Sequence, residues 1–423
     1  MKTSKIVLSF LLAMTIIPVT GAPSKKKSTK VNVDGINYVL DVKNNKARVV
    51  AGKNLYTGDL VIPEKFTEDS VTYYVEAIDG GAFKDCPTLI SVSIPTTVSK
   101  IGANAFDSCT GIESITIPKS VTELASGLFA ECSSLQEVVL HDGIKDMGSG
   151  VFKKCTALEK IVVPNGIKTL PANTFFGCSN LKYVDLPNSL ERINGSAFED
   201  CSSLEEISIP NGVKTIGSDC FKNCSSLKSF VFTTSMSNIA NGLFEGCTSL
   251  EDVKISSSIK SISRDAFKNC ANIDSLYIPN GIKEMGSTVF ENCSNLRIVN
   301  IPNSMHSISS GLFRNCSNIE HITIPSSIRS ISGNAFRDCT SIKHLEIPNS
   351  VKEIGSDAFN GCSSLTTVIM KSGTPCKIKK DSFPKSFIMD GTLYVPNETP
   401  YRADPKSPWS QFREVRKIQS KRF

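Results

Sequence analysis

Cysteine is the residue type with the most chemical potential in this 423-residue chain, and most of its fifteen cysteines share one spacing. Such thiols could pair as disulfides, bind a metal or act as nucleophiles. No Cys-x-x-Cys pair occurs, so two zinc ligands are nowhere supplied together. The cysteines that recur every 23 residues are Cys86, Cys109, Cys132, Cys155, Cys178, Cys201, Cys224, Cys247, Cys270, Cys293, Cys316, Cys339 and Cys362.

The residues around each cysteine repeat with the same period. A phenylalanine precedes each cysteine by three positions, as Phe106 precedes Cys109, and Leu or Ile follows by three. An alternating apolar pair such as Ile115 and Ile117 comes next, and a proline such as Pro118 often closes it. Each unit therefore predicts one short strand, and only stacking on neighbouring units can bury its apolar side chains. We predict a β-rich solenoid, an arc of about thirteen turns with one parallel sheet on its concave face and a cap at each end.

This arrangement predicts the state of the cysteines. Equivalent residues of successive turns lie about 4.8 Å apart, but their Cβ vectors run parallel and do not converge as a disulfide requires. We therefore expect a ladder of buried free thiols that act as small apolar side chains. Cys220 takes a position that is Ala in other repeats, so it is expected in the core, whereas Cys376 is the best candidate for a reactive or bridging thiol.

The repeated pattern Phe-x-x-Cys-x-x-Leu-x-x-Val-x-Ile-Pro resembles the BspA-like class of leucine-rich repeats. The resemblance covers about residues 55 to 412 and recurs at constant spacing, for example from Phe106 and from Phe336. It implies a leucine-rich-repeat solenoid of the kind found in bacterial surface and secreted proteins. More loosely, it implies adhesion to host proteins or to other cells.

Both ends of the sequence depart from the repeat, so the chain is predicted to consist of four regions. Lys2 and Lys5 precede the apolar run 6–19 and the small residues Thr20-Gly21-Ala22, so residues 1–22 read as a signal peptide. Residues 23–58 are predicted to form a β-hairpin cap, 59–370 the solenoid, and 371–423 a degenerate last turn with a C-terminal cap that uses Trp409 as a lid. No segment after the signal is long and apolar enough to cross a bilayer. We expect an exported protein that is secreted, periplasmic or associated with the cell surface.

Composition argues against several function classes. The formal net charge is only +6, which gives no indication of nucleic-acid binding. The sequence contains no phosphate-binding Walker loop, no His-Glu-x-x-His and no Gly-x-Ser-x-Gly. We therefore expect no catalytic residues, no cofactor and no dedicated metal site, and hence a protein that is not an enzyme.

Recognition is expected from the outward positions of the predicted strands, which vary from repeat to repeat. We expect a host or cell-surface protein, including extracellular-matrix proteins, to bind this concave face. His321 and His344 lie one repeat apart with Glu346 nearby, so a surface metal site is the alternative to ordinary exposed side chains. The candidate partner-binding residues are Tyr183, Asp185, Lys254, Tyr277, Ile298, Asn300, His321, His344 and Glu346.

A second set of positions carries mostly cations and suggests an alternative function. These positions lie between the strand and the next Phe, in what we call the return segment, and each directly follows the first apolar residue there, as Lys168 follows Ile167. In contrast, the residue after each Leu or Ile at the strand start is often acidic, as at Glu159 and Glu205. This would segregate charge across the solenoid and form a module that binds a polyanion such as a sulfated glycan. A row of solvated lysines that protects solubility is the simpler interpretation. The residues of this basic lane are Lys145, Lys168, Lys214, Lys260, Lys283, Arg329 and Lys352.

Overall fold

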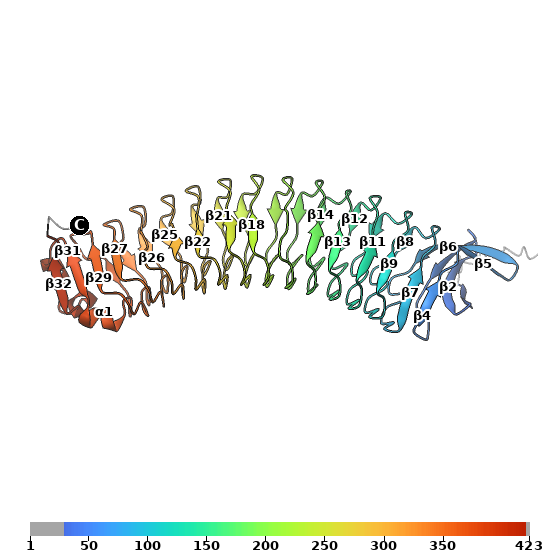
Figure 1. Cartoon of the computed structure of the whole chain (residues 1–423), viewed down its shortest axis with the longest axis horizontal. Helices are drawn as coiled ribbons and strands as arrows, with labels where there is room; N and C mark the ends of the chain where they lie inside the picture. The colour runs from blue at the N-terminus through green and yellow to red at the C-terminus, as the bar shows by residue number, and fades with distance from the viewer. Residues whose placement is uncertain (1–28, 420–423) are drawn as a thin grey trace, which may run out of the picture.

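The computed structural model describes residues 29–419, so the predicted signal peptide lies outside the described residues. The described chain forms one long, gently curved arc of stacked turns that runs from the N-terminal to the C-terminal end (Figure 1). About 15 turns of roughly 23 residues are present, slightly more than the thirteen expected. The difference comes from turns at both ends that lack the repeated cysteine, because β4 (Gly58–Val61), β31 (Thr392–Val395) and β32 (Glu414–Lys417) also stack on the array. The predicted leucine-rich-repeat solenoid is confirmed.

The strand formed in most turns by the Leu-x-x-Val-x-Ile part of the repeat is two to five residues long and pairs in parallel with its equivalent in a neighbouring turn. These strands form six ladders, which we call together the long-strand sheet. Register advances by one repeat at each step, as in Lys160 opposite Tyr183 and His344 opposite Thr367. These strands are β4 (Gly58–Val61), β7 (Leu89–Ser93), β9 (Ser114–Thr116), β11 (Glu137–Val139), β13 (Lys160–Val162), β15 (Tyr183–Asp185), β18 (Ser229–Val231), β20 (Asp252–Lys254), β22 (Ser275–Leu276), β24 (Ile298–Val299), β27 (His344–Ile347), β29 (Thr367–Met370), β31 (Thr392–Val395) and β32 (Glu414–Lys417).

A second parallel ladder, made of two-residue strands on the return segments, was not predicted. A turn in which the N–H of Val98 donates to the carbonyl of Pro95 (3.1 Å) leads into it, and the same bond recurs after most of the repeat prolines. Two residues are too few to produce a recognisable alternation in the sequence. The strands are β8 (Lys100–Ile101), β10 (Glu123–Leu124), β12 (Asp146–Met147), β14 (Thr169–Leu170), β16 (Arg192–Ile193), β17 (Thr215–Ile216), β19 (Asn238–Ile239), β21 (Ser261–Ile262), β23 (Glu284–Met285), β25 (Ser307–Ile308), β26 (Ser330–Ile331), β28 (Glu353–Ile354) and β30 (Lys377–Ile378).

The loop from each short strand to the cysteine is also bonded to its neighbour. The N–H of Phe83 donates to the carbonyl of Ala105 (2.8 Å), and that of Asp85 donates to Asp107 (2.8 Å). The residues that bracket each Phe adopt positive φ, as Asn104 (55°) and Ser108 (60°) do. Asn, Asp and Gly tolerate this conformation better than other residues, which explains why they are frequent at these two positions.

The interior consists of columns of equivalent side chains. The phenylalanines from Phe83 to Phe383 stack nearly parallel, with successive ring centroids 5.1 to 5.8 Å apart. The repeated cysteines are buried and free, as predicted. From Cys109 onward each thiol also donates a hydrogen bond to the Phe carbonyl of the preceding turn, for example Cys109 Sγ to Phe83 O (3.0 Å). Burial raises the pKa of these thiols, to about 12 for Cys132, so they are structural groups.

Cys376 was the best candidate for a reactive or bridging thiol, and the structure contradicts this prediction, since the thiol is buried and free. Its side chain is buried in the C-terminal cap, and burial raises its thiol pKa to about 11. Trp409 covers this region, and its Nε1 donates to the carbonyl oxygen of Cys376 (2.7 Å). Cys220 is fully buried, which agrees with its expected place in the core.

Dedicated elements close both ends of the array. At the N-terminus β1 (Thr29–Val33), β2 (Ile36–Asp41) and β3 (Lys46–Val49) pair antiparallel, and β3 joins β6 (Val71–Ile78) in parallel. An insertion in the first turn forms a second hairpin from β5 (Lys65–Glu68) and β6. The C-terminal cap contains α1 (Lys385–Asp390), α2 (Thr399–Arg402) and the 3-10 helix η1 (Pro408–Gln411). The ring centroids of Trp409 and Phe412 lie 5.4 Å apart, and Trp409 also packs against Phe383 at the end of the phenylalanine stack. Trp409 is 2% exposed, so it covers the core as predicted. Val415 belongs to strand β32, which pairs in parallel with β31.

Candidate functional site

The outward side chains of the long-strand sheet form two columns, which we call the sheet face. In each strand they flank one inward residue, as Tyr183 and Asp185 flank Val184 in β15. The column that contains Tyr183 includes Asp59, Glu137, Lys160, Glu206, Asp252, Ile298, His321, His344, Thr367 and Glu414. The column that contains Asp185 includes Val61, Val139, Val162, Ser208, Val231, Lys254, Tyr277, Asn300, Glu346 and Arg416.

The large apolar residues predicted to bind a partner are strongly exposed. Tyr183 is 57% exposed, and Tyr277 and Ile298 are each 69% exposed. Between residues 91 and 370 the exposed large apolar side chains all belong to the sheet face. They are Val139, Val162, Tyr183, Val231, Tyr277 and Ile298.

Several of the polar residues predicted there are engaged within the chain. The Asn300 amide donates to the carbonyl of Ile278 and accepts from its N–H (both 2.8 Å), so it replaces a strand neighbour in the backbone ladder. Glu346 pairs with Lys371 (3.2 Å), and Lys254 pairs with Asp252 (3.6 Å). Asp185 makes no side-chain hydrogen bond or ion pair within residues 29–419.

The two histidines predicted one repeat apart are exposed on the sheet face. His344 begins β27, and His321 lies at the equivalent position of the preceding turn. Among the residues that the structure describes, no group of three or more His, Cys, Asp or Glu side chains is placed to hold a metal ion. Glu346, the third residue of the suggested metal site, is the one already paired with Lys371.

Sequence reasoning missed a depression on the sheet face that contains Tyr183. Its volume is about 480 Å³, and its apolar floor includes Val139, Val162 and Tyr183. Glu137 and Lys160 also line it. The signal was present in the sequence, because two successive turns place Val where most other turns place a polar residue. What the sequence did not reveal is that the surface is hollowed at that place.

The basic lane is exposed along its length, but its charge is partly offset. Lys214 pairs with Glu191 (2.9 Å), which occupies the equivalent position one turn earlier. Acidic residues directly follow three other lysines of the lane, at Asp146, Glu284 and Glu353. Exposed pairs of this kind contribute little stability, but they lower the local positive potential that a polyanion would meet.

The acidic positions at the strand starts alternate with bases. Lys182 pairs with Glu159 (3.2 Å), and Lys228 pairs with Glu205 (2.8 Å), each across one repeat. Lys182, Lys228, Arg297 and Lys343 share this column with the acids. The charge segregation expected from the sequence is therefore weakened, because bases within the column offset part of its negative charge.

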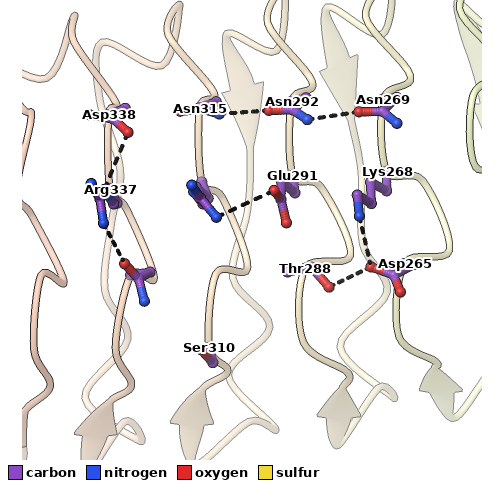
Figure 2. Close-up of polar contacts among 12 residues, drawn as sticks. Asp265, Lys268, Asn269, Thr288, Glu291, Asn292, Ser310, Asn315, Arg337 and Asp338 are labelled. Carbon is purple, nitrogen blue, oxygen red and sulfur yellow. Dashed lines mark hydrogen bonds and ion pairs between the residues drawn. The ribbon is translucent and has the colours of Figure 1, made fainter.

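The loops between the short strands and the cysteines carry a third polar surface, which we call the turn ridge. It comprises the residues equivalent to Asp265, Lys268 and Asn269 in each turn (Figure 2). The amide of Asn292 donates to Asn269, and that of Asn315 donates to Asn292, both at 2.7 Å. Figure 2 also shows Thr288 bonded to Asp265 and Arg337 beside Asp338. Side chains on the turn ridge thus largely bond one another.

Within residues 29–419 the longest helices are too short to span a bilayer. No curated protein sequence matches the chain. Among solved structures, a leucine-rich repeat protein from Bacteroides ovatus is 26% identical, with a TM-score of 0.69 over 82% of this chain and 99% of that one. A leucine rich cell surface protein from Faecalibacterium prausnitzii is 24% identical, with a TM-score of 0.58 over 81% of this chain and 94% of that one, which shows a shared fold.

A family profile for the BspA type leucine rich repeat region matches in six copies, over residues 65–182, 168–297 and 260–389. These matches cover more than half of the chain. They also coincide with the turns in which Phe stacks on Phe and Cys on Cys. The chain therefore belongs to the BspA-type leucine-rich repeat family.

Proposed function

We propose that this chain is a non-catalytic binding protein, secreted or held at a cell surface, that recognises a protein partner through the sheet face. The observation that supports this most directly is the position of the exposed apolar residues. From residue 91 to 370 they all lie on the sheet face. Exposed apolar side chains that gather on one surface of a soluble protein are typical of an interaction site.

The residue types on the sheet face fit protein recognition. Tyrosine contributes a large contact area and loses few rotamers on binding, and Tyr183 and Tyr277 stand with more than half of their surface exposed. Beside Tyr277, the polar side chain of Asn300 is held by two hydrogen bonds to the backbone of Ile278. Rigid polar neighbours around apolar anchors lower the entropy lost when a partner binds.

The family supports export or surface display. The related chain from Faecalibacterium prausnitzii is described as a cell surface protein. The apolar run 6–19 of this chain, with lysines before it and small residues after it, supports a cleaved signal peptide. We expect the protein to act outside the cytoplasm, where host or cell-surface proteins, including matrix proteins, are its partners.

Two variants of residues 23–423 test this proposal. The first carries Tyr183→Ala, Tyr277→Ala and Ile298→Ser on the sheet face. The second carries Lys260→Glu, Lys283→Glu and Arg329→Glu on the basic lane. Binding is measured to a panel of immobilised extracellular-matrix proteins and to heparin, after circular dichroism has shown that both variants are folded.

We expect the sheet-face variant to lose at least tenfold in affinity for the matrix protein that the unmodified chain binds best, and the lane variant to bind nearly as well. The opposite result would favour a polyanion-binding module. In that case only the lane variant would fail, and binding to heparin would disappear at moderate salt.

A further inference from the structure

We propose that the depression around Val139, Val162 and Tyr183 binds a segment of a protein partner in which a basic residue lies beside a large apolar residue. The inference rests on the proposed function, since it specifies the chemistry of the partner at one place on the sheet face. It follows from two features of the depression, namely an apolar floor and nearby carboxylates that make no side-chain hydrogen bond or ion pair within residues 29–419.

The floor spans three successive turns. Val162 lies opposite Asp185 and Lys160 lies opposite Tyr183 in the parallel pair β13–β15. Val139 occupies the position equivalent to Val162 one turn earlier. Val162 is 65% exposed and Val139 is 47% exposed. Neighbouring strands are separated by about 4.8 Å, so these side chains form one continuous apolar area that an aliphatic or aromatic side chain can cover.

Free carboxylates gather around this floor. Elsewhere in the two columns of the sheet face the carboxylates have partners within the chain. Asp252 pairs with Lys254, Glu346 with Lys371 and Glu414 with Arg416, and Asp59 accepts from Ser91 Oγ (2.6 Å).

Glu137, Asp185 and Glu206 are different. None of the three makes a side-chain hydrogen bond or ion pair within residues 29–419. Glu137 and Asp185 line the depression itself, and Glu206 follows one turn after Tyr183. The free cation among them is Lys160. The depression is therefore locally acidic, although the whole chain carries a formal charge of +6.

These features select the class of partner. Unneutralised carboxylates repel nucleic acids and sulfated glycans and attract Lys or Arg, and they gain most from a cation delivered to a partly dehydrated place. The valines offer no hydrogen bonds for the hydroxyl groups of a neutral sugar. An arginine of the partner could also stack on the exposed ring of Tyr183 while it pairs with Asp185. A peptide segment that combines a cation with an apolar anchor satisfies both features.

The experiment uses residues 23–423 as bait for a library of random 12-residue peptides displayed on phage. We expect enriched peptides to carry Lys or Arg within three residues of a large apolar residue. Synthetic copies are then titrated by fluorescence anisotropy against a variant with Asp185→Lys and Glu206→Lys, and against one with Val139→Ser and Val162→Ser. Each variant is expected to weaken binding at least tenfold.

The matched control is a variant with Asp252→Lys and Glu346→Lys. It has the same change in net charge on the same face, but at carboxylates that are already paired. We expect it to bind the peptides within about twofold of the unmodified chain. Thermal unfolding of all variants shows whether they are folded.

Three results would overturn the inference. They are the absence of any enriched peptide, enrichment of acidic or uncharged peptides, and equal weakening by the control variant. The proposed function is tested separately by Tyr277→Ala with Ile298→Ser, which lie outside the depression. If that variant loses matrix-protein binding while the depression variants keep it, the result supports the proposed function and contradicts this inference.

Discussion

The turn ridge and the sheet face are built from the same 23-residue units, but they use polar residues in different ways. On the turn ridge the amides of Asn269, Asn292 and Asn315 bond one to the next along the stack. On the sheet face, Tyr277 and Ile298 of the neighbouring strands are each 69% exposed. Repeated asparagines bond one another in this part of the turn ridge, whereas the varied side chains of the sheet face leave apolar groups exposed to bind something else.

The difference follows from which side chains can bond to a copy of themselves. An asparagine amide both donates and accepts, so a column of asparagines at about 4.8 Å spacing can form a continuous chain of hydrogen bonds. Valine columns cannot, ionised carboxylates only accept, and like charges in successive turns repel. We therefore expect substitutions on the turn ridge and beneath it to change stability, and those on the sheet face to change binding.

The largest expected difference concerns the phenylalanine stack beneath the turn ridge. Phe267 is fully buried between Phe244 (5.5 Å) and Phe290 (5.6 Å). Phe267→Ala should lower the free energy of unfolding by about 3–5 kcal/mol, because it leaves a cavity in the column. Tyr277→Ala on the sheet face should change it by less than about 0.5 kcal/mol. Urea denaturation followed by circular dichroism measures both, and equal losses would remove the distinction.

The asparagine ladder is expected to have a smaller effect. Asn292→Ala removes both amide bonds and places Ala at φ 64°, so we expect a loss of about 1–2 kcal/mol in unfolding free energy. Asn292→Gly removes the same bonds without the backbone strain and should cost less. Urea midpoints separate the two contributions. Identical midpoints for Ala and Gly would show that the left-handed conformation carries no cost here.

The thiol ladder should contribute about 1 kcal/mol per residue. Cys247 Sγ donates to the carbonyl of Phe221 (3.0 Å), and Cys247→Ala removes this donor from a fully buried place. Cys247→Ser keeps a donor at the same position and should lose less. Thermal unfolding under reducing conditions compares the two variants. If Ser is the worse of the two, the thiol acts through its volume and apolar character alone.

The smallest expected effect is a dependence on pH at Asp265. Burial raises the pKa of this carboxyl, but hydrogen bonds from Thr288 and Arg264 outweigh burial and hold the pKa below its ordinary value. The contribution of Asp265 to stability is therefore complete above the pKa of the unfolded chain and disappears as pH falls through the folded value. We expect the urea midpoint of the unmodified chain to fall more steeply between about pH 5 and pH 2 than that of Asp265→Asn. Thr288→Val should shift the profile in the same direction, and parallel profiles for all three proteins would contradict this assignment.

Much of the fold could be predicted because the repeat is almost uniform. The constant spacing from Cys86 to Cys362 requires that equivalent residues occupy equivalent places, so the buried columns follow directly. The same argument predicted free thiols, because stacked Cβ atoms do not converge. It did not predict that the repeated thiols from Cys109 onward donate to a Phe carbonyl, since that bond depends on where the loop places the backbone of the preceding turn.

The candidate site was predicted only in part. The exposure of Tyr183, Tyr277 and Ile298 follows from the alternation of a strand, which places neighbouring residues on opposite faces. The role of Asn300 could not be predicted, because its amide bonds the backbone of Ile278 in the preceding turn. The burial of Cys376 could not be predicted either, because it depends on how the C-terminal cap folds over it and places Trp409 there.

The sequence by itself determined the period, the residues inside and the residues outside, since burial in a stack of identical turns depends only on position within the repeat. Only the tertiary structure decided which outward side chains neutralise one another and which remain free. Glu205 pairs with Lys228, whereas Asp185 makes no side-chain bond within residues 29–419. The length and direction of the side chains in neighbouring turns decide which of these occurs. Those contacts leave an acidic, apolar-floored depression on a chain whose overall charge is positive.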